Sequence, residues 1–365
     1  MALEPITRAE QIMSGKSLIP ITREEMFLAK AGGQDVQTPT PITRKEMFLQ
    51  KIAENGGGSG GSGGENWIGD GNTHVWVGLP DFITSPILGV CPNGTVTVDW
   101  GDGTAPDTLT GTSTSTVKWT PRHNYASSGD YIITLTVDGK MGIAGQLGKG
   151  GFILLHAASG GGHGDTPYKL AVRKVEVGND VANIGDYAFS GCNSLTSVKI
   201  PGSVTTIGSQ AFDACYLLTS IEIPNGVKSV AQRAFQNCCR LMSVEIPDSV
   251  TSIAGYAFSN CRSLASIEIP NGVKSVASNT FEGCHSLTSV KIPDSVTSIA
   301  GYAFNGCAWV RVYDFTNHTA VPALSATNAF TYIPTDCEIR VPTALYDEWI
   351  AATNWSTYAS NIVAV

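Results

Sequence analysis

The sequence has little charge and no long hydrophobic run. Only 15% of its 365 residues are charged, against roughly 25% in an ordinary soluble domain. The formal net charge of −8 argues against a general nucleic-acid binder, because phosphate contacts need a basic face. The most apolar short run, Phe152–Ala158, is too short to span a bilayer. Residues 1–20 contain no apolar signal segment, so we expect no Sec-type export signal.

The motifs of catalysis and cofactor binding are also missing. We find no nucleophile elbow, no His-Glu metal motif and no cofactor loop. Gly145–Gly151 (GQLGKGG) has the glycines of a phosphate loop but lacks the Lys-Ser/Thr pair that would reach phosphate and magnesium. His156 and His163 have no further ligand at metal-site spacing. We therefore expect a protein that is not an enzyme and has no catalytic residues, cofactor or metal site.

Residues 1–55 repeat a short PITR module three times. In each copy a Thr is followed three residues later by Glu, the capping box of a helix start. We expect three short helices, which are marginal alone in water and need an assembly partner. The candidate anchor residues are apolar positions of the second and third copies: Phe27, Leu28, Phe48 and Leu49. A floppy tail is the alternative, and residues 56–64 (GGGSGGSGG) form a flexible linker. The modules resemble N-terminal segments of phage structural proteins.

Residues 65–140 carry the pattern of a small β-sandwich. Val96, Val98 and Trp100 alternate with polar residues and run into the tight turn Gly101–Thr104. A second alternating strand covers Tyr131–Val137. Residues 141–175 are then a Gly-rich connector that leads into the next domain.

Three segments of this domain, WGDGT, HNY and GDYIITLTV, resemble the PKD domain, an immunoglobulin-like sandwich. The resemblance implies a spacer or binding module of surface proteins, with the Trp in the core and the Asp ordering a turn. We therefore expect Asp99, Asp102 and His123 to be structural rather than catalytic or metal-binding.

Residues 176–330 repeat with a period of 23, which predicts a solenoid whose coils stack to close a common core. Two residues per coil form the expected core ladder: Phe189, Phe212, Phe235, Phe258, Phe281 and Phe304, with Cys192, Cys215, Cys238, Cys261, Cys284 and Cys307. The unit resembles the BspA-type leucine-rich repeat of bacterial surface proteins. Residues 331–365 fit that family's C-terminal cap, with a helix expected at Ala344–Thr353. We interpret the six cysteines as a row of buried free thiols, because a straight row cannot surround a tetrahedral metal.

Charged side chains also recur with the repeat. One column contains Lys199, Glu222, Glu245, Glu268 and Lys291, and a second contains Lys228 and Lys274 on alternate coils. These residues are the candidate ligand-contact surface, suited to repetitive ligands such as surface glycans. A plain solvated face is the alternative.

We thus expect a mainly β, multidomain chain: helical N-terminal modules, an immunoglobulin-like (PKD-type) β-sandwich, and a leucine-rich-repeat solenoid with a C-terminal cap. The predicted function is non-enzymatic adhesion by a phage virion fibre, displayed on the virion surface, anchored by its N-terminus and contacting a bacterial surface glycan or protein. The alternatives are a bacterial cell-surface adhesin and a structural spacer of the virion. We expect no nucleic-acid partner and no membrane span.

Overall fold

A computed structural model describes residues 67–79, 85–115, 118–121, 123–126, 129–143, 153–156 and 172–365. The predicted helical modules at 1–55, the linker at 56–64 and the anchor residues Phe27, Leu28, Phe48 and Leu49 lie outside these residues. The described residues belong to one compact unit.

The first strands of the described chain form an antiparallel sheet. They are β1 (Thr73–Leu79), β2 (Ser85–Asp99), β3 (Asp107–Thr112), β4 (Lys118–Trp119), β5 (Gly129–Ile143) and β6 (Ile153–His156). The long strand β5 pairs with β1 through its first half and with β2 over Thr134–Ile143. Alternation in β2 buries Val96 and Val98 completely, and Trp100 is buried just after the strand. The immunoglobulin-like, PKD-type identity of this domain stays a prediction.

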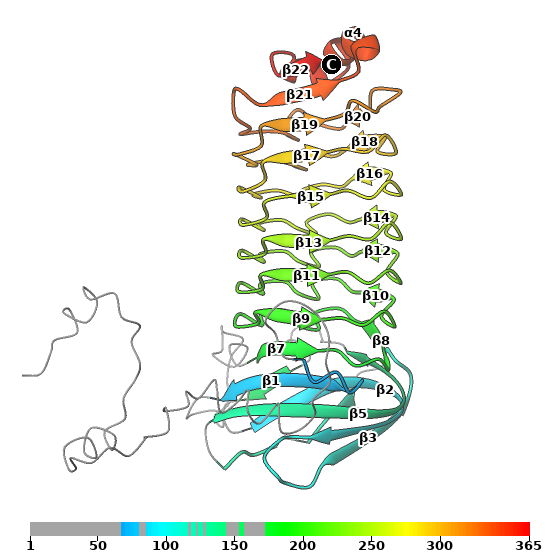
Figure 1. Ribbon diagram of the computed structural model, residues 1–365, viewed down its shortest axis with the longest axis vertical. Helices are drawn as coiled ribbons and strands as arrows, with labels where there is room; N and C mark the ends of the chain where they lie inside the picture. Colours follow the sequence, from blue (N-terminus) through cyan, green and yellow to red (C-terminus); the bar gives the residue numbers. More distant parts are fainter. Residues whose placement is uncertain are drawn as a thin grey trace, which may run out of the picture. The chain divides into compact units, whose positions relative to one another are not determined.

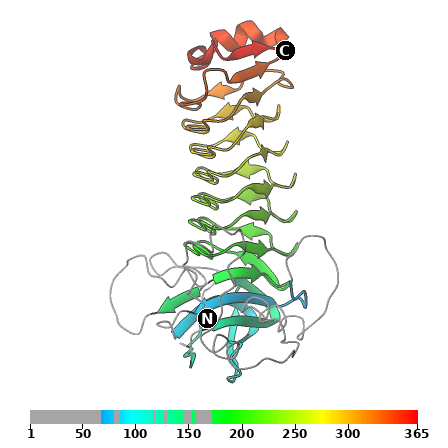
Figure 2. The ribbon, with the colours of Figure 1, turned by 60° about the vertical axis from the view of Figure 1, so that its left-hand side comes forward.

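The repeats form a parallel β-solenoid, so the predicted mainly β fold with coils of 23 residues is confirmed. One sheet contains strands β8 (Val181–Ile184), β10 (Thr206–Ile207), β12 (Ser229–Val230), β14 (Ser252–Ile253), β16 (Ser275–Val276), β18 (Ser298–Ile299) and β20 (Ala323–Leu324). The facing strands are β7 (Val172–Glu176), β9 (Ser197–Lys199), β11 (Ser220–Glu222), β13 (Ser243–Glu245), β15 (Ile267–Glu268), β17 (Ser289–Lys291), β19 (Val312–Asp314) and β21 (Glu338–Val341). Figures 1 and 2 show both columns of strands stacked coil upon coil.

The third side of each coil is a turn that the left-handed region of backbone space makes possible. Two positions per coil have φ near +60°, as at Tyr256 and Asn260. This geometry points alternate amides at the next coil: Tyr256 donates to the Ser278 carbonyl, and Phe258 donates to the Thr280 carbonyl at 2.9 Å. Hydrogen bonds between coils therefore continue on the side that has no strand.

The antiparallel sheet and the solenoid share one core. Strand β1 pairs with β7, the first strand of one solenoid face, and the end of β5 pairs with β8, the first strand of the other. The buried apolar cluster runs without interruption from Val75 to Ile362. The first domain therefore covers the edge that the first coil would otherwise expose.

The C-terminal end of the solenoid is covered by a 3₁₀ turn, η2 (Thr343–Leu345), a short helix, α4 (Tyr346–Ala351), a second 3₁₀ turn, η3 (Trp355–Tyr358), and strand β22 (Ile362–Ala364), which pairs with β21. The helix is shorter than the expected Ala344–Thr353. Trp349 and Trp355 are buried against the last coil, and the Trp355 indole donates to the Pro322 carbonyl at 2.7 Å. Among the described residues, no helix is long and apolar enough to cross a membrane.

Candidate functional site

The first predicted charge column lies along the β9–β17 face. Strand pairing places Glu222 directly opposite Glu245, and Glu268 opposite Lys291. The same register extends the column to three further residues: Glu176, Asp314 and Arg340. The structure therefore brings this predicted column together and lengthens it at both ends.

Much of this column is already neutralised within the protein. The Lys199 ammonium lies 2.9 Å from a Glu176 carboxylate oxygen, and Lys291 has Glu268 and Asp314 as its register neighbours. The Glu222–Glu245 pair is mildly unfavourable, since like charges opposite each other on a sheet repel. Apart from the three central glutamates, Glu222, Glu245 and Glu268, no part of the column has several neighbouring charges of the same sign.

The second predicted set, Lys228 and Lys274, lies on the opposite face. Both side chains are exposed and immediately precede strands β12 and β16. The lysines are two coil spacings apart, about 9.5 Å at ordinary strand spacing. The structure does not bring these lysines together with the glutamate column, so the predicted contact residues form two surfaces and not one site.

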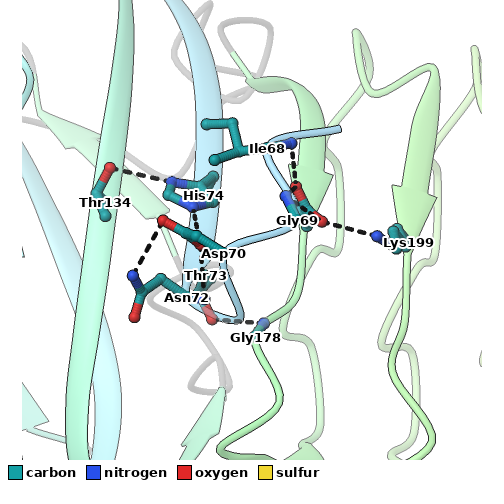
Figure 3. Close-up of polar contacts among 10 residues, drawn as sticks. Ile68, Gly69, Asp70, Asn72, Thr73, His74, Thr134, Gly178 and Lys199 are labelled. Carbon is teal, nitrogen blue, oxygen red and sulfur yellow. Dashed lines mark hydrogen bonds and ion pairs between the residues drawn. The ribbon is translucent and has the colours of Figure 1, made fainter. Parts of the chain in front are cut away.

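The chain enters the described fold through a polar junction at the first two coils. Glu176 is only 4% exposed, and its carboxylate accepts hydrogen bonds from the backbone amides of Ile68 at 2.8 Å and Gly69 at 3.2 Å. Lys199 completes its coordination, and Figure 3 shows these three donors converging. A buried carboxylate with three donors is a strong tie between residues far apart in the sequence.

Two further groups strengthen the same junction. The Lys174 ammonium lies 3.8 Å from the ring centre of Trp67 and 4.7 Å from that of Trp76, a double cation–π contact. His74 lies between Asp70 (2.7 Å) and Thr134 (3.1 Å), as Figure 3 shows. Burial raises the pKa of Asp70, but hydrogen bonds from His74 and Asn72 outweigh this and hold it below its usual value. The charged and titratable side chains of this junction, Lys174, Asp70 and His74, are thus engaged with the protein itself.

The cluster Asp102–His123–Trp100 orders a turn. The His123 imidazole stacks on Trp100 with ring centres 4.6 Å apart, and its Nε2 lies 2.8 Å from Asp102. Asp102 also accepts from the amide and hydroxyl of Thr104. Burial raises the pKa of Asp102, but the bonds from Thr104 and His123 give a net lowering. No group of three or more metal-ligating side chains is found among the described residues.

The ladder residues form the spine of the solenoid. Successive phenylalanine rings stack with centres 5.1 to 5.7 Å apart. From the second coil on, each ladder thiol donates to the carbonyl of a phenylalanine one coil back, as Cys261 does to Phe235 at 3.2 Å. None of the nine cysteines forms a disulfide, and burial raises the pKa of the Cys307 thiol to about 12. These thiols are unreactive packing groups.

One exposed surface was not expected from the repeat pattern. We define the ridge as the residues one, two and four positions after each ladder cysteine: 193, 194 and 196 in the first coil and their equivalents in the next five. Backbone hydrogen bonds from Met242 to Thr219 and from Ala265 to Met242 align its fourth-position residues coil by coil. The ridge carries three of the large hydrophobic side chains most exposed to solvent: Tyr216 (44%), Met242 (55%) and Trp309 (65%). A comparison of the repeats with one another would have revealed it.

A family model described as the BspA type leucine rich repeat region matches residues 168–254 and 230–333, with six copies. This repeat region belongs to the BspA-type leucine-rich repeat family. The BspA-type match includes neither the PITR modules nor the WGDGT turn, so those two resemblances stay predictions.

Solved leucine-rich repeat proteins are similar to this chain. One from Bacteroides ovatus is 29% identical with a TM-score of 0.41, over 47% of this chain and 45% of that one. The T. pallidum leucine-rich repeat protein is 32% identical with a TM-score of 0.41, over 44% and 78%. A leucine-rich cell surface protein from Faecalibacterium prausnitzii is 27% identical with a TM-score of 0.31, over 44% and 57%. This chain thus spans less than half of the Bacteroides ovatus structure. A search of curated proteins found no match to this chain.

These matches give no support to a phage virion role. The repeat-family match favours the alternative that rests on BspA-like repeats.

Proposed function

We propose that the protein is a non-enzymatic binding or adhesion protein of the bacterial cell surface. The BspA-type repeat region carries this proposal, because stacked coils provide a long exposed surface for other macromolecules. The polar clusters at Glu176 and Asp102 are engaged in internal hydrogen bonds and support no reaction.

The first domain contributes to this function by supporting the repeats. Strands β1 and β5 pair with both faces of the first coil, and Glu176 ties residues 68 and 69 to the same coil. We propose a PKD-like module that both caps the solenoid and holds it away from the anchored end of the chain. Binding experiments therefore need the full chain, since removal of β1 and β5 would expose two unpaired strand edges.

Immunolabelling of the producing bacterium tests the location. Antibodies raised against the purified full chain should label intact cells, and brief protease treatment of intact cells should remove the signal. Fluorescent labelling of a cytoplasmic protein, which should need permeabilised cells, is the control. Signal that appears only after permeabilisation, or recovery of the chain in purified phage particles, would contradict a cell-surface location.

A further inference from the structure

The solenoid contains two nearly identical pairs of coils, and their differences identify a special surface. Residues 215–260 and 261–306 are equivalent at an interval of two coils. Ser220–Ala231 recurs unchanged at Ser266–Ala277, and Ile246–Phe258 recurs unchanged at Ile292–Phe304. These unchanged runs include most of both strand faces.

Every ridge position differs between the two copies. The pairs are Tyr216 and Arg262, Leu217 and Ser263, Thr219 and Ala265, Cys239 and His285, Arg240 and Ser286, and Met242 and Thr288. The strand faces differ only at Glu245 and Lys291. The sequence differences between the two copies are therefore concentrated on the ridge and on the turn that adjoins it.

The turn differences have a structural explanation that most ridge differences lack, His285 being the exception, since its ring nitrogen lies 2.8 Å from the Gly306 carbonyl oxygen. On the turn, the Asn237 side chain donates to Asp213 and the Asn260 side chain donates to Asn237. In the second copy, Asn279 and Asn305 both donate to Glu282. The turn of each copy thus has its own set of side-chain hydrogen bonds.

On the ridge, Met242 gives up a contact that the fold offers. At the fourth position, the Thr196 and Thr219 hydroxyls donate to carbonyls of the preceding coil, at 2.9 and 3.3 Å. Met242 replaces this hydroxyl with an apolar chain that is 55% exposed. The exchange removes a hydrogen bond and leaves more than half of the apolar side chain in contact with solvent, so packing does not account for it.

The chemistry of the ridge points to a partner with acidic and apolar groups. No Asp or Glu occupies any of its 18 positions, three in each of six coils, although the chain as a whole has a net charge of −8. Arg240 and Arg262 are exposed on neighbouring coils, and neither makes an ion pair with another described residue. Tyr, Trp and Arg are the residues that contribute most to protein–protein binding.

We propose that the ridge binds an acidic segment of a partner protein, with Arg240 and Arg262 pairing with carboxylates and Tyr216 and Met242 packing on its apolar side chains. A protein is favoured over an anionic glycan because a glycan offers no apolar side chain to Met242. The three glutamates of the neighbouring column repel the same partner and confine it to the ridge. This inference rests on the proposed binding function and gives it a surface.

Binding of the purified full chain to immobilised poly(Glu,Tyr), a random copolymer of glutamate and tyrosine, tests the proposal. We expect saturable binding that weakens with added salt. R240E/R262E should weaken the binding by at least about tenfold, since these arginines occupy the centre of the ridge. Tyr216→Ala should weaken it by about tenfold on the same grounds.

Matched variants elsewhere on the solenoid separate the ridge from general charge and exposure. K228E/K274E makes the same change of charge on the opposite face, and Tyr302→Ala removes a ring that is 45% exposed, against 44% for Tyr216. Both should bind as the unaltered chain does. Circular dichroism confirms that each variant is folded.

Three results would overturn the proposal: no binding to poly(Glu,Tyr), equal losses in the ridge and control variants, or equally tight, ridge-dependent binding to polygalacturonate, an anionic glycan. None of these results depends on where the protein is located. Surface labelling with a failed ridge test would leave the proposed function standing and remove only this surface.

Discussion

Replacement of Phe258 by alanine tests whether the row of phenylalanines holds the coils together. Its side chain is completely buried in the middle of the solenoid. Its ring stacks on Phe235 at 5.4 Å with an angle of 7° between the planes, and on Phe281 at 5.7 Å with an angle of 2°. The substitution therefore removes one ring from two stacked pairs and leaves the backbone bonds between coils in place.

The expected cost follows from burial and stacking. Truncation of a buried phenylalanine to alanine costs about 3–5 kcal/mol of unfolding free energy through lost transfer and the cavity left behind. Each stacked pair contributes roughly 0.5–1.5 kcal/mol beyond area burial, which places Phe258→Ala in the upper part of that range. A loss of this size lowers the Tm by on the order of 10 °C in a domain of this length.

Urea unfolding followed by far-UV circular dichroism measures the loss, with Phe258→Leu as the matched control. Leucine keeps most of the apolar volume and removes the stacking, so its cost should be clearly smaller than that of alanine. A cost for Phe258→Ala of less than about 1 kcal/mol, or one equal to that of leucine, would refute the inference that the rings form the structural spine.

Three further predictions concern the thiols, a buried histidine and the cap. Iodoacetamide should modify Cys239 first in the native protein, because it is the only one of the nine cysteines that is not buried; mass spectrometry locates the label, and rapid modification of the ladder thiols would contradict their burial. Burial lowers the pKa of His318, so the folded protein binds fewer protons than the unfolded chain as this histidine titrates. The contribution of neutral His318 to the unfolding free energy is therefore complete above about pH 6.5 and is lost as the pH falls below that value. Urea unfolding should show a flatter pH dependence between about pH 5 and 6.5 in His318→Gln, and an unchanged slope would assign the dependence to other groups. Tyr358→Phe removes the hydroxyl that accepts from the Phe330 amide and donates to the Thr327 carbonyl, which should cost about 1–3 kcal/mol; thermal unfolding measures this, and an unchanged Tm would show that the bonds contribute nothing.

The solenoid was predictable because its physics is local and repeated. Each coil places Phe and Cys at fixed positions, and residues such as Leu195 and Val204 recur with the same period and are fully buried. A short constant period permits few arrangements other than stacked coils. The turn conformation was not predictable, since Tyr256 and Arg233 adopt positive φ values that side chains of their type rarely take.

The strand pairing at the junction between the two domains could not be predicted from the sequence, for a different reason. Trp76 on β1 lies opposite Lys174 on β7, and Met141 on β5 lies opposite Val181 on β8. Such pairs depend on the three-dimensional arrangement, and no periodic pattern spans them. The PKD-like motif indicates a sandwich but carries no information about which of its strands meets the repeats.

The candidate contact residues were predicted because charges such as Lys228 and Lys274 repeat, and their role in ligand contact stays a prediction. Repetition after duplication is the expected state of any surface position that the fold tolerates, so it is weak support for binding. The ridge was missed for the opposite reason, since its side chains are defined by their differences between coils. Met242 shows the value of that signal, because it departs from threonine at the expense of a hydrogen bond that Thr196 and Thr219 make.

The two ends of the solenoid explain why a binding surface on the coils needs the rest of the chain. A stack of parallel strands leaves an unpaired edge at each end, and such edges pair with other chains unless they are covered. Strands β1 and β5 cover the first coil, while Trp355 and Tyr358 bond to carbonyls of the last. The ridge therefore lies between two covered ends, where a partner has access to exposed side chains of the coils. Recognition must then depend on side chains such as Arg240 and Tyr216, which is why substitutions there are the decisive test.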